Sequence, residues 1–144
     1  MHNQKAQGIV EFALVLPLFL LLVMGIIYFG MAFGDYLVMS NTVRSIAHEA
    51  SLQEDDSDYP AVVQNCTDGV VLVNSIFVWK PDDSGANNKY LDVSYDKSAK
   101  NVVVTATAEY NEDSTIATVL KNFIGSSAEG DINIRYTMYS ASHK

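Results

Sequence analysis

The sequence predicts an α+β protein in which one long N-terminal helix carries a small antiparallel sheet with one or two short helices. Three observations lead to this prediction. An uncharged apolar stretch runs from Phe12 to Gly34, a helical period continues beyond it to about Glu54, and later segments alternate between apolar and polar residues. The chain has 144 residues, so one modest domain follows the helix.

The apolar stretch is long enough to cross a membrane. It holds about 23 residues, which at about 1.5 Å per helical residue exceed a hydrocarbon core of about 30 Å. A cleaved secretory signal fits poorly, because its apolar region would be shorter and would end at a small-x-small site. We therefore expect a retained span over residues 12–34.

The distribution of charge predicts the orientation of this span. The chain has 17 acidic and 9 basic residues, and only Glu11 and Lys5 precede the uncharged stretch. Lys5 before the span and Asp35 after it follow the positive-inside rule, so we expect the N-terminus in the cytoplasm and the C-terminal domain outside. The net charge of −8 therefore lies on the outer domain, which argues against nucleic acid or anionic lipid as a ligand.

Glu11 is the first candidate functional residue. An ionisable side chain in or near a bilayer is costly and marks a function by default, and no basic side chain lies within the run around Glu11. The alternative is that Glu11 lies at the level of the lipid headgroups, in contact with water.

Residues 7–17, after a short polar head at residues 1–6, resemble the N-terminus of TadE-like proteins. Their sequence is QGIVEFALVLP. TadE-like proteins are pseudopilins of tight-adherence (Tad) pilus systems, a branch of the type IV pilins. In that family a prepilin peptidase removes a short leader after a small residue and leaves the glutamate fifth in the mature chain. The resemblance therefore implies a cut between Ala6 and Gln7, although the family usually has glycine where Ala6 stands.

A cut between Gly8 and Ile9 is the competing register. Helix geometry favours the cut after Ala6, because a new amine on Gln7 lies four residues before Glu11 on the same helix face. The two charges can then neutralise each other within or between subunits. An amine on Ile9 lies on nearly the opposite face from Glu11.

Pro17, Gly30 and Gly34 complete the predicted set of assembly and helix-pairing residues. Pro17 disturbs the preceding helical hydrogen bonds, which predicts either a mild kink or a local melting that lets the segment extend in a fibre. Gly30 and Gly34 have the spacing that permits another helix to approach closely on one face.

After the span, apolar residues continue on one face of the helix. They are Tyr36, Met39, Val43, Ile46, Ala47 and Ala50. This stripe predicts that the helix leaves the membrane unbroken and packs against the outer domain. We therefore divide the chain into a leader at residues 1–6, a long helix at residues 7–54 and an extracytoplasmic head at residues 55–144.

Two short helices are expected in the head, each between a capping side chain and a glycine. They cover residues 59–66 and 115–124. Asp58 and Ser114 are the expected N-caps, and Gly69 and Gly125 the expected ends.

Four strands are expected. In residues 70–79 the odd- and the even-numbered positions are both mainly apolar, which predicts a central strand covered on both faces. The turn-rich residues 81–88 predict an exposed hairpin loop after it. The other three segments alternate and predict half-buried strands. They are residues 90–95, 102–110 and 132–139.

The sequence contains no familiar catalytic or ligand-binding motif. It has no phosphate-binding glycine loop, no Cys or His pair at metal spacing and no Gly-x-Ser-x-Gly motif. Cys66 is the single cysteine, so an internal disulfide is impossible. We expect no enzyme activity, no cofactor, no metal ion, no small-molecule substrate and no nucleic acid partner.

The resemblance implies a minor pilin or pseudopilin of a Tad pilus that contributes to pilus assembly and adherence. Its implied place is the bacterial inner membrane, with entry into the pilus as a further step. The implied partners are the lipid bilayer, a prepilin peptidase, other pilin subunits, and the platform proteins and secretion ATPase of the Tad system. Tad major pilins are much shorter than this chain, which favours a minor component.

Two other functions remain open from the residues alone. One is a single-pass, membrane-anchored extracytoplasmic protein that binds a ligand or partner and is unrelated to pili. The other is a membrane-tethered hydrolase whose catalytic groups follow no familiar motif.

Overall fold

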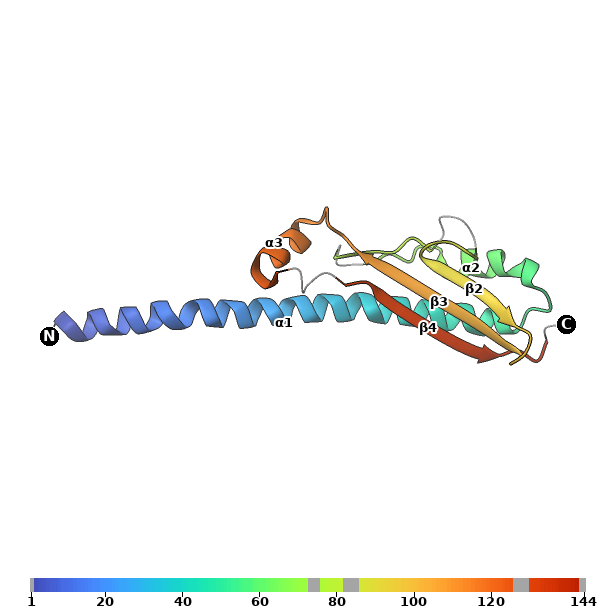
Figure 1. The fold of residues 1–144 in the computed structure, drawn as a ribbon, viewed down its shortest axis with the longest axis horizontal. Coiled ribbons are helices and arrows are strands. Elements are labelled where there is room, and N and C mark those ends of the chain that lie inside the picture. Colours follow the sequence, from blue (N-terminus) through green and yellow to red (C-terminus); the bar gives the residue numbers. More distant parts are fainter. Residues whose placement is uncertain (1, 73–75, 82–85, 126–129, 143–144) are drawn as a thin grey trace.

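A single long helix forms the axis of the molecule. The computed structural model describes residues 2–72, 76–81, 86–125 and 130–142. Helix α1 (His2–Ser51) has 50 residues and is continuous through Pro17. Its N-terminal half projects alone, whereas its C-terminal half lies along the head (Figure 1). The predicted helix that leaves the span unbroken is therefore confirmed.

The head contains short helices and an antiparallel sheet, which confirms the α+β class. In chain order its elements are η1 (Asp56–Asp58), α2 (Tyr59–Thr67), β1 (Phe77–Val78), β2 (Leu91–Asp96), β3 (Asn101–Tyr110), α3 (Thr115–Ile124) and β4 (Ile132–Tyr139). Strand β3 is central, because β2 and β4 both pair with it and β1 pairs with its last two residues. Val104 of β3 lies opposite Val93 of β2 and Tyr136 of β4.

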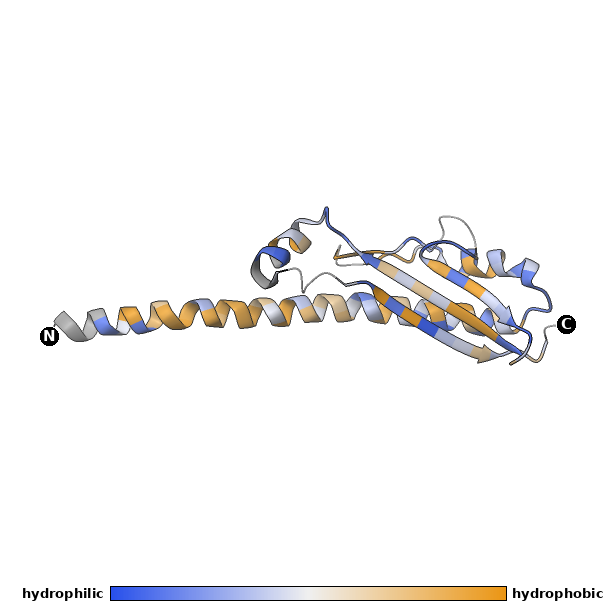
Figure 2. Cartoon of the chain, viewed as in Figure 1, coloured by the Kyte–Doolittle hydropathy of each residue, from blue (hydrophilic) through white to orange (hydrophobic). Residues whose placement is uncertain are grey.

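The core lies between α1 and one face of the sheet. Alternate residues of β3 are fully buried, and apolar and polar residues alternate along the strands (Figure 2). The buried set of β3 is Val102, Val104, Ala106 and Ala108. Five of the six predicted stripe residues of α1 are also fully buried, and they are Met39, Val43, Ile46, Ala47 and Ala50. The periodic patterns thus identified both surfaces of the core.

Tyr36 is the exception in the predicted stripe. Its side chain is 42 % exposed, whereas that of the preceding residue, Asp35, is fully buried. Successive helical residues are rotated by about 100°, so the buried face of α1 begins one residue earlier than the apolar pattern indicated.

The predicted central strand at residues 70–79 is wrong. Only Phe77–Val78 joins a ladder, at the end of β3, and Val71 is 74 % exposed. Trp79 is buried outside any strand, where its indole Nε1 donates to the carbonyl oxygen of Tyr90 at 3.0 Å. The apolar run is therefore buried only in part, and its apolar character does not specify a partner for backbone hydrogen bonds. Part of the prediction, at residues 73–75, lies outside the described residues.

The predicted hairpin loop is also wrong in two respects. Strand β1 pairs with β3 and not with β2, so the connection is not a hairpin, and Pro81 and Ala86 are buried and not exposed. Asn88 organises the end of the connection between β1 and β2. The side-chain oxygen of Asn88 accepts from the backbone N–H groups of Tyr90 and Leu91, and its Nδ2 donates to the carbonyl oxygen of Pro81. Residues 82–85 lie outside the described residues.

The helix ends test the predicted caps. The Ser114 hydroxyl accepts from the N–H of Ala117, and Gly125 ends α3 with a φ of 76°, as expected. Asp58 precedes α2 but its side chain makes no capping hydrogen bond. Asp55 caps instead, because its carboxylate accepts from the N–H of Ser57 and starts the short helix η1.

The C-terminal end of α1 is fastened to the end of the sheet. Ser140, directly after β4, is buried, and its hydroxyl donates to the carbonyl oxygen of Ser51 at 2.8 Å. Ser51 is the last residue of α1. This bond satisfies one of the carbonyl groups that a helix leaves open at its C-terminus.

Candidate functional site

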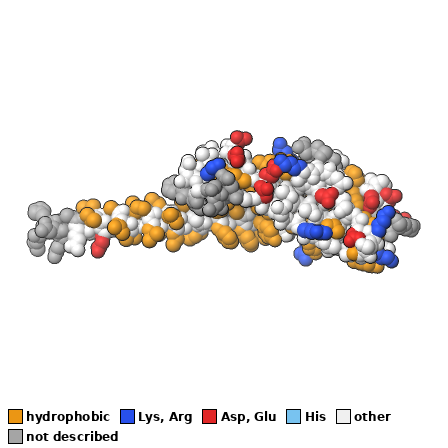
Figure 3. All heavy atoms as spheres, in the orientation of Figure 1, with side chains coloured by type: hydrophobic (Ala, Val, Ile, Leu, Met, Phe, Trp, Pro, Cys, Tyr) orange, Lys and Arg blue, Asp and Glu red, His pale blue; other side chains and the backbone are white. Residues whose placement is uncertain are grey.

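The candidate site is the projecting half of α1. Among the described residues, one helix is long and apolar enough to cross a membrane, and its candidate segment is Gln7–Ser51. The most apolar part of this segment is not buried anywhere within the fold. In the space-filling view it forms a hydrophobic rod, while charged side chains gather on the head (Figure 3). Helix α1 therefore has the length and composition of a single-pass membrane anchor.

Glu11 and Gln7 lie on the same surface of this rod. Together with three apolar side chains they line a shallow hollow on the helix, and those three are Val10, Leu14 and Val15. Within the part of the chain that the structure describes, no basic group forms an ion pair with Glu11. The carboxylate is thus presented on an apolar surface that is open to a partner.

The two candidate cleavage bonds lie close together in α1. Ala6, Gln7, Gly8 and Ile9 are all in its first turns, and the side chains of Gln7 and Ile9 are exposed. Both bonds occupy the same helical setting, so the fold favours neither register.

Pro17, Gly30 and Gly34 have different surroundings. The helix shows no break at Pro17. A Cβ atom added to Gly30 would meet nothing within 4 Å, so the space beside this glycine is empty within the chain. Gly34 is partly buried, next to the fully buried Asp35. The structure therefore leaves Gly30 open for another helix, while Gly34 lies where α1 enters the head.

An exposed row of aromatic rings lies at the C-terminal end of the apolar segment, and sequence reasoning missed it. Phe29 and Phe33 stack with their ring centroids 6.3 Å apart, and Phe33 and Tyr36 follow at 6.4 Å. Their spacing of four and three residues places them on one helix face, so the row was readable from the sequence. Tyrosines are enriched where a span meets the membrane surface.

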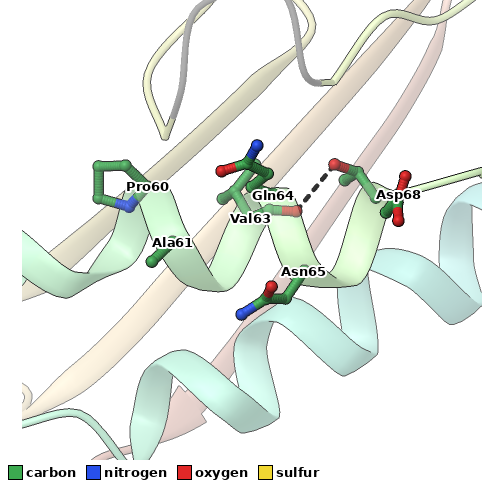
Figure 4. A pocket seen from close by; sticks show the side chains of 7 residues that line it. Pro60, Ala61, Val63, Gln64, Asn65 and Asp68 are labelled. Atoms are coloured by element: carbon green, nitrogen blue, oxygen red, sulfur yellow. Dashed lines mark hydrogen bonds between the residues drawn. The ribbon is translucent and has the colours of Figure 1, made fainter.

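The hollows of the head do not form an enclosed site. One, of about 800 Å³, is lined by seven residues of α2 and its C-terminal end, six of which are labelled in Figure 4. A single helix cannot surround a ligand. A second hollow of about 470 Å³ lies between α2 and β2, beside Tyr59. Burial of Tyr59, with the nearby negative charge of Asp56, raises the pKa of its phenol, which therefore stays neutral.

Cys66 and the acidic residues offer no evident chemistry. Burial, with a smaller contribution from Glu49, raises the pKa of the Cys66 thiol to about 11. The thiol therefore stays protonated at neutral pH, and Cys66 packs against the core as a small apolar group. In the described ranges, no three His, Cys, Asp or Glu side chains are grouped so that they could hold a metal ion.

Comparison with known families finds one similarity, and it lies in α1. The sequence model of a family described as TadE-like protein matches residues 6–48, which covers the candidate cleavage site, Glu11, the whole span and most of the helix that packs on the sheet. No curated protein and no solved structure matches the chain. The TadE-like family is structural and associated with Tad pili. The resemblance read from the first residues is therefore confirmed, because residues 6–48, which lie within α1, match the model of TadE-like proteins.

Proposed function

We propose that the protein is a minor pilin or pseudopilin of a Tad pilus and contributes to pilus assembly and adherence through its projecting helix. The observation that carries this proposal is the open apolar surface around Glu11, which lies within the segment that matches TadE-like proteins. An apolar rod that the head does not cover is suited first to a bilayer and then to neighbouring helices in an assembly.

The proposed role of Glu11 is to pair with an N-terminal amine. Cleavage between Ala6 and Gln7 places a positive charge one helical turn before the carboxylate, on the same side of α1. The low dielectric of a membrane or a helix bundle strengthens their attraction and makes either charge costly when unpaired. A subunit that approaches with its amine beside a neighbour's Glu11 is therefore held in one axial register.

The remaining parts of the proposal concern place and partners. The span lies in the inner membrane with the short leader on its cytoplasmic side, and the acidic head at residues 55–144 lies outside the cytoplasm. A prepilin peptidase removes residues 1–6 on the cytoplasmic side. The mature chain then meets other pilin subunits and the platform proteins and ATPase of the Tad machinery.

The test is mass spectrometry of the mature N-terminus in the native host. We expect a chain that begins at Gln7 and lacks residues 1–6. A chain that begins at Ile9 would overturn the register and keep the pilin function. A mature protein that retains residues 1–6 would overturn the pilin function and leave a plain membrane-anchored binding protein as the better explanation.

A further inference from the structure

Helix α3 lies beside the span and not on the sheet. It crosses the middle of α1 at the inner end of the head (Figure 1). The two helices enclose a groove of about 200 Å³ whose lining is almost wholly apolar. Its principal side chains are Met24, Ile27, Tyr28 and Met31 of α1 and Ile116 and Val119 of α3.

Helix α3 is held in this position from the head side. The hydroxyl of Tyr110, at the end of β3, donates to the carbonyl oxygen of Ala117 at 2.7 Å, and Ala117 is 1 % exposed. The cap at Ser114 fixes the first turn of α3. In contrast, Ile116 is 43 % exposed and Val119 is 39 % exposed. One side of α3 is thus tied to the head, while Ile116 and Val119 line the groove and remain partly open.

The sequence of α3 is amphipathic. Apolar residues stand at positions 116, 119, 120, 123 and 124, a spacing that forms one helical face. Lys121 is the only charged residue of the helix, and Glu112 and Asp113 precede it. The helix therefore has an apolar face for a lipid surface, but it has no cluster of basic residues for anionic headgroups.

The position of the groove along the span determines its depth in the membrane. The uncharged stretch from Phe12 to Gly34 has its centre near Val23, so Met24 and Met31 lie about 1.5 Å and about 12 Å beyond the centre along the helix. Each leaflet contributes about 15 Å to the hydrocarbon core, which places the groove within the outer leaflet. A span shifted to begin at Gly8 still places this segment across the boundary of the hydrocarbon.

We propose that α3 is a second membrane contact, inserted into the outer leaflet beside α1, and that lipid acyl chains fill the apolar groove between the two helices. The proposal rests on the membrane anchoring and outward orientation of the proposed function. Tyr36, at the end of the aromatic row, lies beyond the groove, at the level expected for the membrane surface. The head is then held against the membrane by two elements and not by one.

The test measures the depth of α3 in a bilayer with the full chain. The chain is reconstituted at high dilution into vesicles of phosphatidylethanolamine and phosphatidylglycerol that contain lipids with a spin label on the acyl chain. A fluorophore is attached to Ile116→Cys or Val119→Cys in a Cys66→Ser background. Thr118→Cys is the matched control, because position 118 lies about 200° around the helix from position 116. Leu20→Cys, in the exposed middle of the span, reports insertion of α1.

Quenching at positions 116 and 119 is expected to be roughly threefold stronger than at position 118, because an interfacial helix buries only its apolar face, about 5–10 Å deep. The pattern should persist in high salt and in vesicles without anionic lipid, since apolar area carries the binding. Strong quenching at position 20 with equally weak quenching at positions 116 and 118 would overturn the role of α3 and leave the anchor intact.

Two other results also decide against the proposal. Weak quenching at position 20 as well would overturn the anchor, and with it both this inference and the membrane part of the proposed function. Quenching at position 116 that falls as the protein density rises, together with energy transfer between differently labelled chains, would show that a second copy fills the groove in place of lipid.

Discussion

The two halves of α1 belong to one continuous helix and have opposite surroundings. In residues 7–34 most large apolar side chains are exposed, as for Leu14 at 76 % and Phe29 at 71 %, whereas Met39 and Ile46 in the second half are fully buried. The first half is apolar on all sides, while the second has a polar face with residues such as Asn41 and Arg44. The second half is therefore built for a core, and the first for a surrounding that is itself apolar.

This difference separates two contributions of one helix, one to the stability of the head and one to contacts outside the chain. Substitutions in the covered half should change the stability of the head, because they alter packing that is complete within the chain. Substitutions in the projecting half should leave that stability unchanged and alter contacts with lipid or other subunits. Four substitutions test this separation, each against a control.

Glu11→Leu should have the largest effect, on assembly and not on folding. In the pairing proposed above, removal of the carboxylate leaves the amine of Gln7 unpaired, at a cost of about 3–5 kcal/mol in a low-dielectric setting. We expect normal membrane insertion, but loss of co-purification with the assembly partners and loss of piliation in the native host. Glu11→Asp should be intermediate, because it keeps the charge and shortens the reach.

The control for Glu11 is Glu54→Leu, the same change at an exposed position beyond the end of α1. It should assemble normally. Normal yield and piliation of Glu11→Leu would mean that Glu11 is a hydrated boundary residue without a partner.

Ile46→Ala should cost about 2–5 kcal/mol in the free energy of unfolding of the head, because it opens a cavity beneath the sheet. Ile26→Ala makes the same change in the projecting half, where the side chain is 65 % exposed, and should cost less than about 0.5 kcal/mol. Denaturant unfolding of the full chain in detergent, followed by the fluorescence of the single buried Trp79, measures both values. Similar losses in the two variants would refute the separation.

Ser140→Ala should cost about 1–2 kcal/mol, because it leaves the buried carbonyl oxygen of Ser51 without its hydroxyl donor. Ser94→Ala, at an exposed site on β2, serves as the control in the same unfolding experiment. A loss no greater than that of Ser94→Ala would show that the bond between the ends of α1 and β4 does not stabilise the covered half.

Gly30→Ala should have the smallest effect. An added Cβ atom meets nothing within the chain, so the fold is preserved, and helix propensity improves by up to about 1 kcal/mol. Close approach of another helix becomes harder, so energy transfer between labelled copies in vesicles should fall. Gly25→Ala adds the same methyl group into equally open space and should not change the transfer. Equal behaviour of the two variants would exclude Gly30 from the contact.

The elements that were predicted correctly have signals that act over a few residues. The alternation of β3, the cap at Ser114 and the apolar stripe from Met39 onward each follow from local geometry, and each is confirmed. The shared face of Gln7 and Glu11 likewise follows from their spacing. Helical and extended backbones have fixed periods, so such patterns do not depend on the rest of the chain.

The errors concern contacts between distant segments. The run that ends in Trp79 is apolar enough for a central strand, but its burial comes from packing and a side-chain hydrogen bond to Tyr90. Asp35 reads as the first charge outside the span, yet folding buries it completely. The docking of α3 beside Tyr28 depends on where β3 ends, which no short pattern encodes.

The continuity of α1 also has a mechanical consequence. The helix is a rod about 75 Å long, and its far end is bonded to the sheet through Ser51 and Ser140. A force applied along the helix at the N-terminus is transmitted to the sheet. A rotation of the span about its axis turns the head through the same angle. The direction in which the head faces therefore depends on the contacts that the projecting segment makes at the opposite end of the helix.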